Sequence, residues 1–166
     1  MSRRTIRPWV FLIALAPAMP ALAVSADKIA GRASVIDGDT IEIAGERIRF
    51  DGIDAPESRQ TCADGKGAPY RCGRAAAEAL DAFLARSRPT TCVITGKSWD
   101  RWVGICQRAD GRDVNRFLVL QGLAIAWPKY SKGRYAREQQ DAERARRGLW
   151  SGRFERPCLV RRAACD

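Results

Sequence analysis

The sequence predicts an α+β fold in which several short strands form a small barrel and three helices lie between and after them. Apolar residues two positions apart mark the strands, and apolar residues with helical spacing mark the helices. The chain of 166 residues has the length of one domain and contains no repeat, low-complexity stretch or internal linker. Short strands interleaved with helices in one such domain are typical of the α+β class.

The first strands form a three-stranded antiparallel unit. Apolar and polar residues alternate over residues 28–36, which predicts a half-buried strand. A hairpin with its turn at residues 44–45 follows, because apolar residues stand two apart on both arms, at Ile41, Ile43, Ile48 and Phe50. This hairpin places Thr40 roughly opposite Arg49, with a slip of one residue as the alternative register.

Acidic residues gather around this hairpin. Pro56 ends the second arm, so Asp54 and Glu57 are expected on an exposed loop near Asp39. Carboxylates at Asp39 and Asp54 are oxygen ligands of the kind that Ca²⁺ prefers, and the planar fork of Arg49 fits phosphate oxygens. Taken singly, each residue is explained as well by turn chemistry or a solvated strand face. An EF-hand is excluded, because the third acid and the glycine of that loop are missing.

Apolar spacing and turn residues define the remaining elements. Asp113 is suited to cap a short helix, and Gly122 and Gly148 are suited to end helices. We expect a helix over residues 74–85, a hairpin with strands at 91–95 and 102–107, a helix over 114–121, a strand over 123–127 and a helix over 135–147.

The first residues resemble a secretory signal. A basic start precedes an apolar run over residues 9–23, which ends in Ala-x-Ala at residues 21–23. Cleavage is expected between about residues 23 and 26, which leaves a domain at 27–152 and a tail at 153–166. A membrane anchor is the alternative, but the run is short and contains two prolines. We therefore expect an exported protein, periplasmic or extracellular, without stable membrane association.

All six cysteines follow this signal, and an even number in an exported chain favours disulfides. Neighbours in sequence suggest three pairs among the roughly 15 pairings that six cysteines allow. These pairs are Cys62 with Cys72, Cys92 with Cys106, and Cys158 with Cys165. No Cys-x-x-Cys occurs, which disfavours a zinc knuckle or a thioredoxin-like site.

The composition restricts the chemistry further. The chain has no histidine, which excludes Ser-His-Asp and Cys-His catalysis and histidine-bound zinc. The formal net charge is +10, and loss of Arg3, Arg4 and Arg7 with the signal would lower it to +7. Such an excess favours a polyanionic partner, which includes nucleic acid, anionic lipid and cell-wall polymers.

Three residues outside the first cluster are candidates for substrate contacts. Arg101, at the tip of the second hairpin, is a candidate phosphate contact, with an exposed turn arginine as the alternative. Aromatic side chains stack on bases in proteins that bind single strands. Tyr130, beside Pro128 and Lys129, suits that role as well as a structural one, whereas Trp127 is expected in the core.

These motifs resemble the staphylococcal-nuclease-like (thermonuclease) family. Its pattern of Asp-Gly-Asp-Thr, Arg and Gly-Ile-Asp-x-Pro-Glu occurs here at residues 37–40, 49 and 52–57. The similarity extends over roughly residues 28–151, through the strand from Arg101 and the terminal Arg-Gly-Leu-Trp at 147–150. Several motifs in matching order make the resemblance specific. It implies an OB-type five-stranded barrel with three helices and calcium-dependent hydrolysis of DNA and RNA, with 3′-phosphate ends.

The resemblance also implies roles for individual residues. Asp39, Asp54 and the main-chain carbonyl of Ala55 would bind calcium, and Asp37 and Thr40 would orient these ligands. Arg49 and Arg101 would hold the scissile phosphate, Glu57 would activate or orient water, and Tyr130 would contact the substrate. Two positions depart from the family: Asp100 replaces a glycine before Arg101, and Pro128 replaces a tyrosine of the base-binding site.

The sequence thus favours an exported, monomeric, calcium-dependent nuclease with little sequence preference. The alternatives are a non-catalytic nucleic-acid-binding module on the same barrel and a protein that binds cell-wall or lipid polyanions. Three converging acids, Asp39, Asp54 and Glu57, argue against a pure binding module, since they would repel phosphate.

Overall fold

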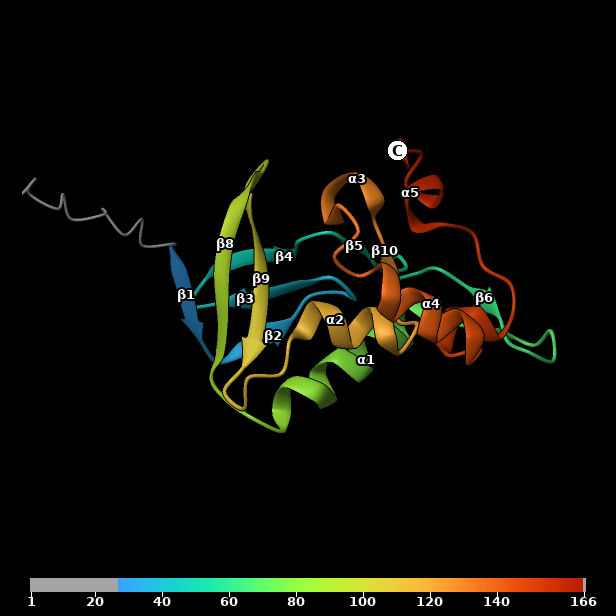
Figure 1. Ribbon diagram of the computed structural model, residues 1–166, viewed down its shortest axis with the longest axis horizontal. Coiled ribbons are helices and arrows are strands. Elements are labelled where there is room, and N and C mark those ends of the chain that lie inside the picture. Colours follow the sequence, from blue (N-terminus) through green and yellow to red (C-terminus); the bar gives the residue numbers. More distant parts are fainter. Residues whose placement is uncertain (1–26, 166) are drawn as a thin grey trace, which may run out of the picture.

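A six-stranded mixed sheet forms the centre of the computed structural model, which describes residues 27–165 (Figure 1). The predicted signal peptide lies outside the described residues. The strand order is β1-β8-β9-β4-β3-β2, and only the pair β4 and β9 is parallel within this sheet. The strands are β1 (Lys28–Gly31), β2 (Ala33–Val35), β3 (Thr40–Ile43), β4 (Glu46–Phe50), β8 (Thr90–Ser98) and β9 (Arg101–Arg108).

The hairpin β3–β4 has the predicted turn and register. Ala44 and Gly45 both have positive φ angles, 53° and 85°, as a tight two-residue hairpin requires. Thr40 lies directly opposite Arg49, so the alternative register is excluded. On β4, Ile48 and Phe50 are buried while Arg49 between them is partly exposed, as the alternation of a strand predicts.

The second hairpin, β8–β9, is longer than predicted. Residues 96–98 pair with the start of β9 although 96 and 97 are exposed, so backbone pairing continues past the apolar pattern that marks the strands. Cys92 lies opposite Cys106 and forms a disulfide with it. The disulfides Cys62–Cys72 and Cys158–Cys165 are also present, so all three predicted pairings are confirmed.

The three predicted helices correspond to α1 (Cys72–Ala85), α2 (Val114–Leu120) and α4 (Ala136–Arg144). Asp113 caps α2, because its carboxylate accepts a hydrogen bond from the Arg116 N–H at 2.8 Å. α4 ends before its predicted limit at residue 147, and Gly148 begins the 3₁₀ helix η1 (Gly148–Ser151) instead of ending α4. The single-turn helices α3 (Pro128–Ser131) and α5 (Pro157–Val160) escaped prediction, since one turn carries no apolar period.

Two strand predictions are wrong in their details. The segment 28–36 is two strands, because β1 pairs with β8 whereas β2 pairs with β3. Asp54 does not lie on an exposed loop but in β5 (Ile53–Asp54), which pairs with β10 (Ile125–Ala126). β10 is also shorter than the predicted strand over 123–127. The partner of β5 comes from a distant part of the sequence, so local pattern could not predict that Asp54 is buried.

The core lies between the sheet and the helices, which confirms the α+β class. α1 and α2 lie side by side (Figure 1). They pack through stacked Phe83 and Phe117 rings, with centroids 3.7 Å apart. A second, smaller core lies beside β6 (Cys62–Ala63) and β7 (Pro69–Tyr70). Closure of the strands into a five-stranded barrel stays a prediction. Within residues 27–165, no helix has the length and apolar character needed to cross a membrane.

Candidate active site

The hairpin and the short strand β5 bring two aspartates and an arginine together. The Phe50 N–H donates to the main-chain oxygen of Asp39 at 2.8 Å, which fixes the chain just before β3 against the end of β4. Asp54 approaches from β5, where it lies opposite Ile125 of β10. Both aspartates are buried, with 4% and 1% of their surface exposed. Buried carboxylates are costly unless other groups compensate their charge.

Neighbouring groups hold the Asp39 carboxylate in place. The Thr40 hydroxyl donates to its Oδ1 at 3.0 Å, and the Ala55 N–H donates to its Oδ2 at 3.3 Å. The main-chain N–H of Asp39 donates to Asp37 Oδ1, also at 3.0 Å. Gly38 is required for packing, since a Cβ there would lie 2.8 Å from the Ala55 Cβ. Asp37 and Thr40 therefore both contact Asp39.

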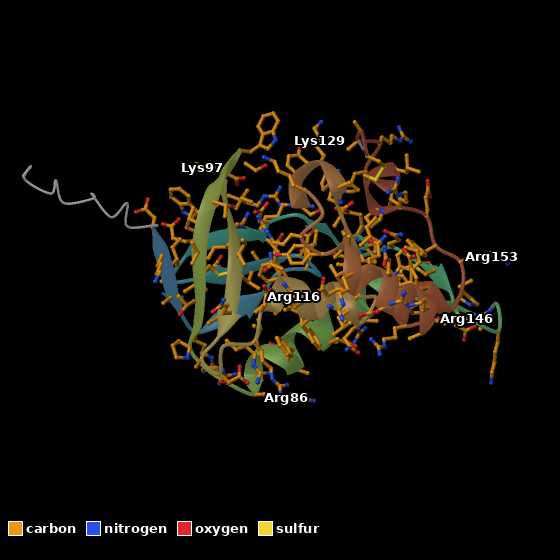
Figure 2. All side chains as sticks on the ribbon, viewed as in Figure 1. Arg86, Lys97, Arg116, Lys129, Arg146 and Arg153 are labelled. Atoms are coloured by element: carbon orange, nitrogen blue, oxygen red, sulfur yellow. A yellow bond between two sulfur atoms is a disulfide. The ribbon has the colours of Figure 1, made fainter. Side chains whose placement is uncertain are left out.

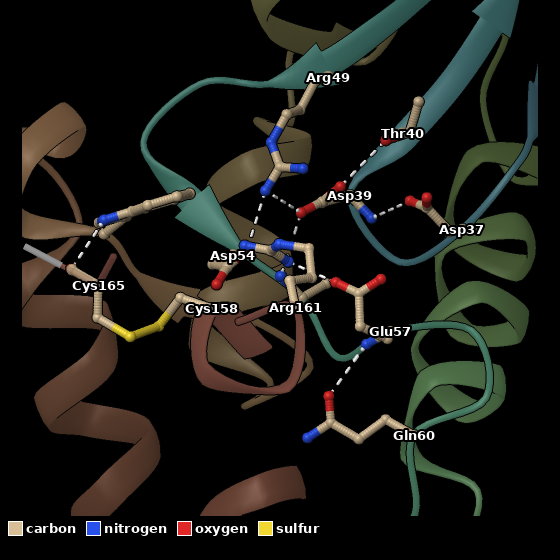
Figure 3. Close-up of polar contacts among 12 residues, drawn as sticks. Asp37, Asp39, Thr40, Arg49, Asp54, Glu57, Gln60, Cys158, Arg161 and Cys165 are labelled. Atoms are coloured by element: carbon tan, nitrogen blue, oxygen red, sulfur yellow. Dashed lines mark hydrogen bonds and ion pairs between the residues drawn. A yellow bond between two sulfur atoms is a disulfide. The ribbon is translucent and has the colours of Figure 1, made fainter. Parts of the chain in front are cut away.

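Arg49 joins the two aspartates through a single nitrogen (Figure 3). Its Nη2 lies 2.8 Å from Asp39 Oδ2 and 2.9 Å from Asp54 Oδ1. Both ion pairs use Nη2, so Nε and Nη1 can donate to a further ligand. The side chain is 15% exposed, which leaves it accessible from the surface.

Burial changes the acidity of both aspartates. It raises the pKa of Asp39 to about 6, opposed by the positive charge of Arg49 and assisted by the nearby Asp37 and Asp54 carboxylates. Burial also raises the pKa of Asp54, opposed by hydrogen bonds and attraction from Arg161 and Arg49. Both pKa values show that the aspartates carry charge at a cost, which a bound cation would offset.

Glu57 lies on the loop after β5, against the start of α1. Its main-chain N–H donates to Gln60 Oε1 at 3.1 Å, and its side chain is 37% exposed. The loop packs closely, because a Cβ on Gly73 of α1 would lie 1.8 Å from the Glu57 carbonyl oxygen. Glu57 and Asp54 share one partner, Arg161.

Arg161 is the site residue that sequence reasoning missed. Its Nη2 lies 2.6 Å from Asp54 Oδ1, and its Nη1 lies 2.5 Å from Glu57 Oε1 (Figure 3). Burial works against its charge, but hydrogen bonds to Glu57 and Asp54 raise the pKa of the guanidinium. The only sequence signal was an arginine inside a short cysteine loop, and nothing in its spacing connects it to residues 54 and 57.

An open groove of about 570 Å³ lies beside this cluster, between the β8–β9 tip and α3. Arg49, Arg101 and Arg161 line it together with Trp127 and Tyr130. The Tyr130 ring packs edge-on against Trp127, with centroids 4.8 Å apart, and is half exposed. Trp127 is only half-buried, so its predicted core position is only partly correct. Arg101 shares the groove with Arg49, but among residues 27–165 it forms no ion pair with the acids.

Comparison with known proteins identifies the family. A sequence profile described as staphylococcal nuclease homologue matches residues 47–152. The chain belongs to this family. The matched segment of this chain includes Arg49, Asp54, Glu57 and Arg101. Asp39 precedes the matched segment and Arg161 follows it.

Relatives of this staphylococcal nuclease homologue carry two kinds of name. The chain is 51% identical over 138 residues to the succinoglycan biosynthesis protein ExoI of Rhizobium meliloti (strain 1021), covering 82% of this chain and 72% of that protein. It is 31% identical over 122 residues to an uncharacterized endonuclease of Escherichia coli O157:H7, covering 70% of this chain and 73% of the relative. An uncharacterized endonuclease of Escherichia coli matches with the same identity and coverage.

Asp39 and Asp54 fit the calcium ion that the resemblance to this family implies. Asp54 Oδ2 is buried without a hydrogen-bond partner in the described part of the chain, and both aspartates already share one cationic nitrogen. No group of three Asp, Glu, His or Cys side chains in residues 27–165 is arranged to hold a metal.

Proposed function

We propose that the protein is an exported, calcium-dependent nuclease that hydrolyses phosphodiester bonds of DNA and RNA with little sequence preference. The observation that carries this proposal is the contact of Arg49 Nη2 with both buried aspartates beside an open, arginine-lined groove. Hydrolysis of a phosphodiester needs positive groups where negative charge develops. The relatives named endonucleases support the reaction class. The name of the succinoglycan relative describes a biosynthetic process and no reaction.

Each residue has a chemical role in this proposal. Asp39, Asp54 and the Ala55 carbonyl would hold the calcium ion, which stabilises negative charge on the phosphate when bound. Nε and Nη1 of Arg49 would donate to a non-bridging phosphate oxygen, and Arg101 would bind the phosphate from the opposite wall of the groove. Trp127 and Tyr130 offer an aromatic surface on which a base can stack.

Glu57 would take a proton from the attacking water. The water oxygen bonds to phosphorus as the bond from phosphorus to the 5′ oxygen breaks. The leaving 5′ oxygen takes a proton from solvent water in the open groove, which leaves a 3′-phosphate and a 5′-hydroxyl. Arg161 contacts Oε1 of Glu57, so Oε2 can accept this proton.

A cleavage assay tests the proposal. Oxidised mature protein is incubated with single-stranded DNA, with calcium or with a chelator, alongside the variant Glu57→Gln. We expect calcium-dependent cleavage that the variant lacks, while binding of the strand persists because the variant has one negative charge fewer. An acidic polysaccharide serves as a control polyanion without phosphodiester bonds. Binding without cleavage under any divalent ion would contradict the proposal and indicate a binding module.

A further inference from the structure

We propose that Arg161 is a third active-site arginine, which binds the scissile phosphate beside Arg49. The disulfide loop Cys158–Cys165 holds it there. This inference rests on the proposed nuclease function and assigns a residue outside the segment shared with the family, which ends at residue 152.

Arg161 and Arg49 occupy equivalent positions around the same two groups. Each places its Nη2 on Asp54 Oδ1, at 2.6 Å and 2.9 Å. Each guanidinium also lies over the Trp127 ring, at 5.8 Å and 5.9 Å from its centroid. The two guanidinium groups therefore lie side by side (Figure 3), and both side chains line the groove. Two such forks together can bind two oxygens of one phosphate.

Arg161 retains donors for a ligand. A guanidinium has five N–H groups, and the two ion pairs of Arg161 use one on each terminal nitrogen. Its side chain is 25% exposed and lines the groove. A ligand in the groove can therefore reach the remaining N–H groups without displacing Asp54 or Glu57.

The charges of the cluster make Arg161 important for binding a phosphate. The carboxylates of Asp39, Asp54 and Glu57 contact the two guanidinium groups of Arg49 and Arg161, and the nearby Asp37 carboxylate adds a fourth negative charge. With a bound divalent cation, these four carboxylates and two guanidinium groups would sum to zero. Without Arg161 the same cluster would carry one net negative charge and would repel a phosphodiester anion.

The tail from residue 153 onward accepts hydrogen bonds from Gln60 and Trp127, two residues beside Glu57 and the groove. Gln60 Nε2 donates to the Glu155 carbonyl at 2.8 Å, while Oε1 of the same amide accepts from the Glu57 N–H. The Trp127 indole N–H donates to the Cys165 carbonyl at 2.9 Å. The disulfide Cys158–Cys165 closes the segment between these anchors. The loop that carries Arg161 is thus fixed to Glu57 on one side and to the groove wall on the other.

Two matched variants test the proposal. Arg161→Gln and Arg162→Gln each remove one positive charge from the same loop, and the Arg162 side chain is exposed. We expect Arg161→Gln to lower kcat/KM for single-stranded DNA with calcium by at least about tenfold, as loss of a donor to developing charge does. Arg162→Gln should stay within about twofold of the wild type, as expected for an exposed charge. Thermal unfolding of both variants checks that the fold is retained, and Arg161→Lys replaces Arg161→Gln if that variant does not fold.

A binding measurement separates this inference from the proposed function. With a chelator present, binding of a single-stranded oligonucleotide is measured as a function of salt. Loss of one phosphate contact should reduce the slope of log K against log salt by about 0.7 in Arg161→Gln only. A wild type that binds but never cleaves would refute the nuclease proposal, while the difference in slope would still support phosphate binding by Arg161.

Three outcomes would overturn the inference. Faster cleavage by Arg161→Gln would show that the guanidinium blocks the site, and unchanged cleavage would show that it is only structural. Equal losses in both variants would show a general charge effect. The variant Cys158→Ala with Cys165→Ala tests the role of the loop: it should slow the wild type but should not slow Arg161→Gln further.

Discussion

At the scale of single residues, the site depends on a few atoms that serve two partners each. Arg49 Nη2 contacts both aspartates, and the Gln60 amide contacts both Glu57 and the tail. Because one atom serves two groups, a small change of side-chain geometry removes two contacts together. The alternation of β4 and the turn at residues 44–45 predicted Arg49 roughly opposite Thr40, and the strand pairing of the structure excludes the slip of one residue. No local signal indicated Gln60 or Arg161.

We expect Arg49→Lys to lower kcat/KM by about 10²-fold, the usual range for loss of one donor to the transition state. A lysine keeps the charge but loses the planar fork, so it cannot serve both aspartates and a phosphate. Steady-state kinetics on single-stranded DNA measures the change. Arg47→Lys, at an exposed position of the same strand, is the control. Equal activity of Arg49→Lys and the wild type would contradict a role for the fork.

Asn115 is a second residue with several partners, and it lies in the core. Its Oδ1 accepts from the Cys106 N–H at 3.2 Å, and its Nδ2 donates to the Asp51 carbonyl at 3.0 Å. Asn115→Leu leaves buried backbone groups without partners and should lower the free energy of unfolding by about 2–4 kcal/mol. Chemical denaturation measures it. Gln121→Leu at an exposed site should change little, and equal stability of both variants would refute the argument.

At the scale of elements, close packing between α1 and the loop after β5 places Glu57. α1 was predicted from its alanines and its apolar spacing. Its first residues, Cys72 and Gly73, were not predicted, because contacts with other parts of the chain place them in the helix. Cys72 is tied to Cys62, and Gly73 lies directly against Glu57. The helix was therefore predictable from sequence, whereas its close packing against the loop that carries Glu57 was not.

Gly73→Ala should displace the Glu57 loop. The added methyl group would lie 1.8 Å from the Glu57 carbonyl oxygen, so the loop or the helix must move. We expect a loss of about 1–3 kcal/mol in unfolding free energy, the usual cost of overpacking, and a fall in kcat of at least about tenfold. Denaturation and single-turnover cleavage measure the two effects. Arg74→Ala, at the next residue and exposed, should retain both properties of the wild type.

At the scale of the whole molecule, basic side chains are spread over the surface, whereas the residues of the candidate active site lie in one cluster. Arginines and lysines project from several sides of the protein, including Arg86, Arg116, Arg146 and Arg153 (Figure 2). Lys97 and Lys129 lie on either side of the groove, on β8 and α3 (Figure 2). Composition favours a polyanionic partner, and the motifs pointed to Asp39, Arg49 and Asp54, which the structure brings together. The path of the tail was unpredictable, because its contacts join residues far apart in sequence.

The disulfide Cys92–Cys106 should contribute mainly to stability, and the disulfide Cys158–Cys165 mainly to activity. Cys92–Cys106 joins two fully buried residues near the open end of the β8–β9 hairpin with a sequence separation of 14, so Cys92→Ala with Cys106→Ala should lower the free energy of unfolding by about 3 kcal/mol. Cys158–Cys165 closes only a short surface loop, so its removal should change activity more than stability. Denaturation of both double variants measures the comparison. A larger loss of stability from the tail variant would contradict this division.

The position of Arg161 after the family domain determines when the site becomes complete. A ribosome that has finished residues 47–152 has not yet added Arg161, and the loop that carries it closes only where thiols are oxidised. Under the proposed export, a full-length chain that is still in a reducing cytoplasm lacks this closed loop, so only the ion pairs with Asp54 and Glu57 hold Arg161 at the site. The proposed nuclease would therefore be less active before export than after it.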